Sequence, residues 1–177
     1  MSEIIFTTIH GSRLYGFAHA GSDFDTFTVT DSTSQRVKQS VDGEGNDRAI
    51  VGIDRFLSLA VSGSHQSVEA LFSPVKEWAD TDSARKWRTL IESVQIGGPD
   101  VFEKYERTIR KFSHGDFKRR RHAVRLRLNL DELRMSQRID RVRLTPAMVS
   151  HCTVLAERFE GDDLAGELGV LRTSETA

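Results

Sequence analysis

The sequence predicts a protein of the α+β class. Strand-like segments gather in residues 1–75, and from Ser83 onward apolar residues recur at helical spacing. This separation of strands from helices along the chain is typical of the α+β class. The chain has 177 residues, of which 38% are hydrophobic and 29% charged, which suits one domain with a buried core and excludes a disordered or collagen-like protein.

Three β-branched or aromatic segments are expected to be strands: residues 4–9, 24–30 and 49–53. The connection over residues 31–46 is rich in Ser, Gly and Asp, which indicates a loop or a wide hairpin connection. Asp54 is expected to cap a following helix, because its carboxylate can accept a hydrogen bond from a first-turn N–H group. Residues 68–72 fit either a short strand or a helix.

Helices are expected over about residues 83–94, 101–112, 117–138 and 146–159. The last of them opens with Pro146 at a first-turn position, where proline is favoured. We therefore divide the chain into a core over residues 1–82, a helical part over residues 83–160 that packs on it, and a tail over residues 161–177. The tail is expected to fray after Gly161.

Basic residues are concentrated in the second half of the chain. The formal net charge is −1, yet residues 104–143 carry 14 basic and 5 acidic side chains. Such a surplus favours an anionic partner such as a nucleic acid. The alternative is a solvated helix face whose charge is neutralised by the acidic first half. If Lys118–Arg121 is helical, its four side chains cannot all face one ligand.

The apolar runs are too short to span a bilayer, and the N-terminus lacks the basic start and long apolar stretch of a secretory signal. Cys152 is the single cysteine, so it can form neither an internal disulfide nor a cysteine-based zinc site. These features lead us to expect a soluble, cytoplasmic protein with no membrane partner.

Asp23 and Asp25 stand two residues apart at the start of the second expected strand. Both side chains should therefore point to the same face of the sheet, while Phe24 between them points into the core. Two carboxylates on one side are costly to keep charged unless a cation lies between them, and such oxygen ligands suit Mg²⁺ shared with substrate phosphates. Asp47 joins the pair if the third strand lies beside the second. The alternative for an Asp-x-Asp pair is a solvated strand edge.

Gly11-Ser12-Arg13 follows the first expected strand, where the chain must turn and start a helix. Glycine permits close approach of the backbone to a ligand, and free N–H groups at a helix start suit a phosphate. The Ser12 hydroxyl adds a further donor. By itself, a Gly-Ser pair after a strand is usually only a turn.

Taken together, these residues resemble the nucleotidyltransferase superfamily built on the DNA polymerase β palm. Gly11-Ser12, the ten residues 13–22 and Asp23-Phe24-Asp25 match its pattern of a Gly-Ser pair, a spacer and an Asp-x-Asp pair. The longer strings Gly-Ser-Arg-Leu-Tyr-Gly at 11–16 and Ser-Asp-Phe-Asp at 22–25 resemble the predicted RNA-repair-type branch more closely. The resemblance covers about residues 4–160.

This resemblance implies a palm-type fold, with a small mixed sheet backed by helices and followed by a helical C-terminal part. It also implies transfer of a nucleoside monophosphate from an NTP to a hydroxyl group, with release of pyrophosphate. Asp23 and Asp25 are then expected to hold two Mg²⁺ ions, with Mn²⁺ as an alternative, and Asp47 to complete one ligand set. The acceptor that suits the basic segment 104–143 is RNA, either a tRNA or an RNA 3′ end.

The resemblance also implies nucleotide contacts. Gly11 and Ser12 would hold the β- and γ-phosphates, and Arg13 is either a phosphate contact or an outward salt bridge. His122 and Arg125 match an His-x-x-Arg pair on one helix face, where they either reach over the triphosphate or support the helix as a structural pair.

Two neighbouring residues have mainly structural interpretations. Glu69 matches an acidic position of the same branch, but a capping or salt-bridge role outweighs a site role. His10, beside the Gly-Ser turn, is expected to be a satisfied structural histidine.

Other function classes stay open at this point. The same site could nucleotidylate a protein or a small molecule, as in antitoxin-like minimal members. A non-catalytic nucleic-acid-binding module would use only the basic helices. A degenerate palm would bind NTP and regulate a partner, although three intact carboxylates argue against such decay.

Overall fold

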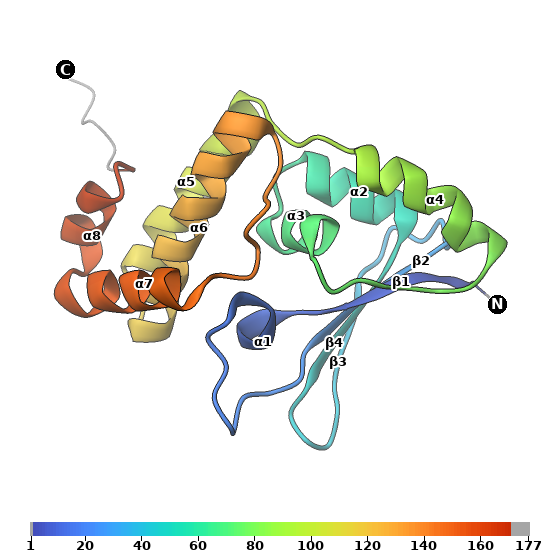
Figure 1. Ribbon diagram of the computed structural model, residues 1–177, viewed down its shortest axis with the longest axis horizontal. Helices are drawn as coiled ribbons and strands as arrows, with labels where there is room; N and C mark the ends of the chain where they lie inside the picture. Colours follow the sequence, from blue (N-terminus) through green and yellow to red (C-terminus); the bar gives the residue numbers. More distant parts are fainter. Residues whose placement is uncertain (1, 171–177) are drawn as a thin grey trace.

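The computed structural model describes residues 2–170, which form one five-stranded sheet and a set of helices (Figure 1). The strands are β1 (Ile4–Ile9), β2 (Thr26–Thr30), β3 (Lys38–Val41), β4 (Asp47–Gly52) and β5 (Glu77–Trp78). The helices are α1 (Gly11–Tyr15), α2 (Ile53–Val61), α3 (His65–Phe72), α4 (Asp82–Ser93), α5 (Pro99–Ser113), α6 (Phe117–Ser136), α7 (Pro146–Arg158) and α8 (Gly161–Glu167). All strands precede α4, so the predicted α+β class is confirmed.

The sheet is mixed, as the sequence predicts. Its strand order is β3-β4-β2-β1-β5, in which β2 and β4 run parallel and all other neighbours run antiparallel. Thr26 of β2 pairs with Arg48 of β4, so the residues that precede these two positions lie side by side at one edge of the sheet.

One face of the sheet carries the core. In β2, Phe27 and Val29 are buried while Thr26 and Thr28 are only half-buried, and the Phe27 ring lies 5.9 Å from the ring of Phe56 in α2. Helices α2 and α4 lie on this side of the strands (Figure 1). On the other face, the hydroxyl groups of Thr7 and Thr28 lie 3.1 Å apart, as polar cross-strand neighbours.

The expected position of Phe24 in the core is wrong. Strand β2 begins only at Thr26, so the alternation of a strand does not extend to Phe24, and its side chain is 48% exposed. Its backbone N–H group donates to Asn46 Oδ1 at 2.7 Å, and the Arg13 guanidinium lies over its ring at 5.6 Å. The Asp23–Asp25 segment is therefore a loop held at the edge of the sheet.

Two segments that the sequence left open are settled by tertiary pairing. Residues 31–46 contain a further strand, β3, which pairs antiparallel with β4 and is joined to it by the turn at residues 42–46. Residues 68–72 are helical, as the second half of α3, and are buried. The short helix α1 was expected from the turn after β1, whereas the two-residue strand β5 carries too little sequence signal to be predicted.

Helices α5 and α6 pack along each other, with α7 against α6 and α8 against α5. The expected fraying after Gly161 is wrong for residues 161–170, because Leu164, Leu168 and Val170 are buried and Arg127 Nη1 donates to the Leu168 carbonyl oxygen at 2.6 Å. Residues 171–177 of the predicted tail lie outside the described part. Among residues 2–170, no helix has both the length and the apolar character needed to cross a bilayer.

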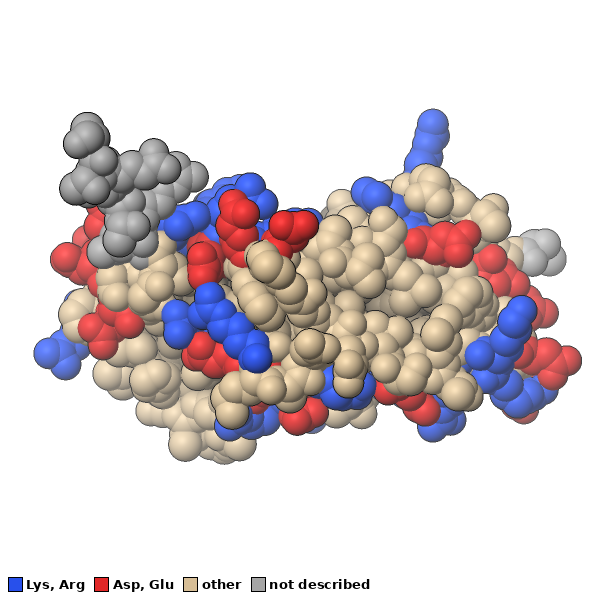
Figure 2. Space-filling view, turned by 90° about the horizontal axis from the view of Figure 1, so that it is seen from above, with Lys and Arg blue, Asp and Glu red and all other residues tan. Residues whose placement is uncertain are grey.

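The basic segment 104–143 does not form a uniformly basic face. On the face of the molecule that Figure 2 shows, Lys and Arg side chains are interspersed with Asp and Glu side chains. Six of the basic side chains of this segment join ion pairs, namely Arg107, Arg120, Arg125, Arg127, Arg134 and Arg141. Only Arg125 pairs with the acidic first half of the chain, through Glu69, and the other five ion pairs use carboxylates of the second half. Neutralisation by the first half, the alternative considered for this segment, therefore applies to a single side chain among these six.

Candidate active site

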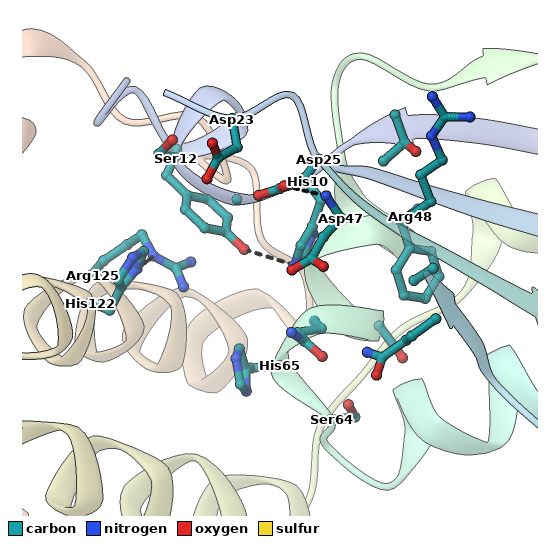
Figure 3. A pocket seen from close by; sticks show the side chains of 18 of the residues that line it. His10, Ser12, Asp23, Asp25, Asp47, Arg48, Ser64, His65, His122 and Arg125 are labelled. Carbon is teal, nitrogen blue, oxygen red and sulfur yellow. Dashed lines mark hydrogen bonds between the residues drawn. The ribbon is translucent and has the colours of Figure 1, made fainter. Parts of the chain in front are cut away.

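A cavity of about 670 Å³ lies where the sheet meets the helical part of the chain (Figure 3). Its walls come from the turn between β1 and α1, the starts of β2 and β4, the start of α3 and the N-terminal half of α6. This volume is typical of small-molecule and cofactor sites.

Gly11 allows the backbone to approach a carboxylate closely. Its φ is +67°, in the left-handed region, and an added Cβ atom would lie 2.4 Å from Oδ2 of Asp25. Only glycine fits both constraints, because any other side chain would clash and strain the backbone. The Gly11-Ser12 turn therefore presents its backbone directly beside Asp25, and both residues line the cavity.

The structure brings Asp25 and Asp47 together. They precede the paired positions Thr26 and Arg48, and the backbone N–H group of Asp47 donates to Asp25 Oδ1 at 3.0 Å. Asp47 is the first residue of β4, two residues earlier than the predicted start of this strand. The condition set by the sequence, that the third strand lies beside the second, is thus met.

Asp23 lines the same cavity as Asp25 and Asp47, and Figure 3 shows it near Ser12. The donor set suits a hard divalent cation, because it offers carboxylate oxygens and no soft ligand. Within residues 2–170, no three His, Cys, Asp or Glu side chains are already gathered around one point as a metal cluster. Ion binding by the three carboxylates is therefore a proposal.

Arg13 faces the loop and not the cavity. Its Nε and Nη2 groups donate to the carbonyl oxygens of Asp23 and Ser22 at 3.0 and 2.7 Å. This side chain thereby fixes the loop that carries Asp23. A phosphate contact by Arg13 stays a prediction, and the alternative outward salt bridge is not formed among the described residues.

Beneath the cavity lies a buried polar network centred on Glu69. The carboxylate, fully buried, accepts hydrogen bonds from Tyr15 Oη at 2.6 Å, Arg125 Nη1 at 2.6 Å and Asn129 Nδ2 at 3.2 Å. Burial acts to raise the pKa of Glu69, but the Arg125 guanidinium outweighs it, together with other neighbours, and the pKa lies below its ordinary value. The salt-bridge interpretation of Glu69 is confirmed.

Arg125 is held by this network as a structural partner. Its side chain is 1% exposed and lies over the Tyr15 ring at 3.7 Å, in addition to its ion pair with Glu69. Breaking one partner of such a buried pair costs about 3–5 kcal/mol, because the other charge is left uncompensated. Arg125 also reaches the cavity wall, so a nucleotide contact stays a prediction alongside this structural role.

His122 is a neutral hydrogen-bond donor on the cavity wall. Arg125 Nε–H donates to His122 Nδ1 at 3.2 Å, which leaves the ring proton on Nε2. Burial, followed by the positive charge of Arg125, lowers the pKa of His122 to about 3. The rings of Tyr15 and Phe17 pack edge-on against the imidazole at 5.5 Å. Any phosphate contact of His122 would therefore be a hydrogen bond and not an ion pair.

The expectation that His10 is a satisfied histidine is wrong. The single Tyr15 hydroxyl proton is donated to Glu69, so the long 3.4 Å contact with His10 requires His10 Nε2 to be the donor. Nδ1 is then a bare acceptor, and it is buried without a hydrogen-bond partner. His10 lines the cavity beside the Gly-Ser turn.

Sequence reasoning missed a second wall of the cavity. Ser64, His65 and Gln66 at the start of α3 and Lys118 and Arg119 at the start of α6 all line it. The run of basic residues at 118–121 was a signal, but its periodicity does not show which of its members face a cavity that another segment closes.

Residues 1–160 match the family model RlaP, described as the RNA repair pathway DNA polymerase beta family. No curated protein matches the chain. The family match confirms the predicted resemblance to polymerase β-like nucleotidyltransferases, and the mixed sheet with its flanking helices agrees with it.

Replacing Gly11 with Ala should disturb the site at its tightest point. We expect the free energy of unfolding in urea to fall by about 1–3 kcal/mol, because the new Cβ meets the Asp25 carboxylate and the backbone is strained. Gly43→Ala is the matched control, since a Cβ there meets nothing within 4 Å. Equal stability of the two variants would contradict the close approach of Gly11 to Asp25.

Folding stability should fall on mild acidification, since burial lowers the pKa of both His65 and His122. In the unfolded chain these histidines take up protons near pH 6.5, whereas in the folded chain His122 stays neutral far below that pH. Between pH 7 and pH 5 we expect His122 to contribute a loss of about 1–2 kcal/mol, and His65 a loss in the same direction.

His122→Gln should reduce this pH dependence, measured by urea unfolding, while His151→Gln, at an exposed position on α7, should leave it unchanged. Stability that stays level or rises between pH 7 and pH 5 would show that these imidazoles are not buried as described.

Proposed function

This chain belongs to the RNA repair pathway DNA polymerase beta family, and we propose that it is a Mg²⁺-dependent nucleotidyltransferase that modifies RNA. Family membership supports nucleotidyltransferase activity in general. The observation that carries the finer proposal is the pairing of Asp25 with Asp47 at the starts of two parallel strands, beside the Gly11 backbone.

The reaction we propose is attack of an acceptor hydroxyl oxygen on the α-phosphorus of an NTP. A bond from the acceptor oxygen to phosphorus forms, the bond from phosphorus to the pyrophosphate oxygen breaks, and pyrophosphate leaves. Positioning and charge stabilisation supply most of the catalysis in such transfers. When bound, two divalent ions, Mg²⁺ or Mn²⁺, would stabilise the attacking and leaving oxygens.

Each residue of the cavity then has a distinct role. Asp23 and Asp25 would hold the ions, and Asp47 would complete one ligand set and favour loss of the acceptor proton. The Gly11 and Ser12 N–H groups and the Ser12 hydroxyl would bind the β- and γ-phosphates. Because these groups come from three separate segments, the folded sheet itself positions them.

The helical part would close the cavity from the other side. In this proposal, residues 1–82 form the catalytic core and residues 83–160 bring His122 and Arg125 to the nucleotide. His122 Nε2–H would donate to a phosphate oxygen, with Arg125 orienting the ring. We place the reaction in the cytoplasm, in keeping with Cys152, which is buried and free.

Asp25→Asn is the most direct test of the proposed chemistry. The asparagine Oδ1 can still accept the Asp47 N–H group, so the fold should persist while the charge is lost. With each labelled NTP, Mg²⁺ and total RNA, we expect labelled RNA from the wild type and a loss of about 10²–10³-fold in rate from the variant, comparable to removing one stabiliser of transition-state charge.

Asp31→Asn is a matched control, because Asp31 Oδ1 also accepts a backbone N–H group, that of Glu3 at 2.8 Å, but it follows β2 and lies outside the cavity wall. Unchanged activity of Asp25→Asn would contradict the proposal. If the wild type binds RNA but transfers no nucleotide in any of the reactions, the non-catalytic module is favoured. If protein is labelled in place of RNA, a protein acceptor is favoured.

A further inference from the structure

The cavity has two chemically different ends. One end carries Asp23, Asp25 and Asp47 together with the Gly-Ser turn. Figure 3 shows Ser64 and His65 on the opposite side of the cavity from Asp23 and Ser12. The start of α3 and the start of α6, with Asp116, Lys118 and Arg119, form this second wall, and we call it the basic end. The Asp116 carboxylate is engaged as the cap of α6, where it accepts from the Arg119 N–H group at 2.8 Å.

The start of α3 offers unused hydrogen-bond donors to the basic end. The Ser64 side chain, at the N-cap position, makes no capping hydrogen bond, and among the described residues the backbone N–H groups of residues 65–67 have no acceptor. The first N–H groups of a helix lack intrahelical partners, and the helix dipole makes them a favourable place for an anion.

A half-buried side chain at the same place also lacks a hydrogen-bond partner among the described residues. The His65 imidazole packs edge-on against Phe112 at 5.9 Å and lines the cavity, yet no hydrogen bond joins it to another described residue. Burial lowers its pKa, in spite of the nearby Glu69 charge, so the ring is neutral at pH 7. A neutral imidazole that lines the cavity without a hydrogen-bond partner among the described residues is suited to a hydrogen bond with a ligand.

Lys118 and Arg119 carry positive charges at a position where a positive charge does not stabilise the helix. They belong to the first turn of α6, where the helix dipole disfavours cations, and neither joins an ion pair among the described residues. Their neighbours are used differently: Arg120 binds Glu160 and two carbonyl oxygens, and Arg121 lies over the Phe17 ring at 4.2 Å. Two free cations at the cavity wall are therefore available to an anionic ligand.

We propose that the basic end binds a phosphate group of the acceptor RNA strand, next to the hydroxyl that reacts. This inference rests on the proposed function and deepens it. In an in-line transfer the attacking and leaving oxygens lie on opposite sides of the phosphorus, so an acceptor enters opposite the pyrophosphate. With the pyrophosphate at Gly11 and Ser12, the acceptor strand comes from the side of Ser64, Lys118 and Arg119.

The test compares RNA affinity with nucleotide affinity in the full chain. The double variant Lys118→Gln, Arg119→Gln changes two exposed side chains, so it should fold like the wild type. We expect the Kd for a short single-stranded RNA to rise about 10-fold or more at 0.15 M salt. The slope of log K against log salt should become shallower by about 0.7 for each lost phosphate contact.

In the same double variant, the affinity for non-hydrolysable NTP analogues with Mg²⁺ should stay within about twofold of the wild type, because Gly11, Ser12 and His122, the groups that we assign to the triphosphate, are unchanged. The matched control is Arg107→Gln, Lys111→Gln, which removes two exposed charges of the same basic segment on α5, outside the cavity. This control should bind RNA as the wild type does.

Three outcomes would overturn the inference. Unchanged RNA affinity and an unchanged salt dependence of that affinity in the double variant would contradict the phosphate contact. Failure of the wild type to bind RNA would contradict it as well. A larger loss of NTP affinity than of RNA affinity would assign the basic end to the triphosphate. An equal loss of RNA affinity in the control would indicate a diffuse basic surface. Binding needs no turnover, so failure of the transfer assay would not be mistaken for failure here.

Discussion

The parallel pairing of β2 with β4 is the constraint on which the site depends. It places the residues that precede both strands at one edge of the sheet, so Asp25 and Asp47 meet although 22 positions separate them. The left-handed glycine at position 11 then lets the β1–α1 turn reach the same carboxylate. A different strand order would scatter these groups, however well the sequence motif were kept.

The opposite wall is stabilised by a buried charge pair instead of backbone pairing. Glu69 from α3 and Arg125 from α6 join the core to the helical part, and Tyr15 from α1 completes the contact. Because all three segments also reach the cavity, this pair fixes the cavity's shape and the ring of His122 together. The buried charges of Glu69 and Arg125 are thus paired with each other, whereas the charged side chains of Lys118 and Arg119, which line the cavity, are available to ligands.

The sequence was sufficient for the fold class, because strand alternation and helical spacing are local patterns, and the Gly-Ser/Asp-x-Asp spacing led to the mixed sheet through the family resemblance. The meeting of Asp25 with Asp47 was predicted only on the condition that the two strands are neighbours, because strand pairing is not a local property of the sequence. The sequence failed for Phe24, since a strand boundary is set by pairing with β4, and for the segment after Gly161, whose apolar residues gain their burial from α5 and α6. The basic end could not be foreseen, because it joins the starts of two helices that are distant along the chain.

The central claim is that three carboxylates at this sheet edge hold divalent cations for the transfer. Mn²⁺ binding, followed by electron paramagnetic resonance in the presence of a non-hydrolysable NTP analogue, measures this directly. The account predicts two Mn²⁺ ions per chain for the wild type, and loss of this binding when Asp23, Asp25 and Asp47 are all replaced by Asn. The same number of bound ions in the wild type and in that triple variant would contradict it.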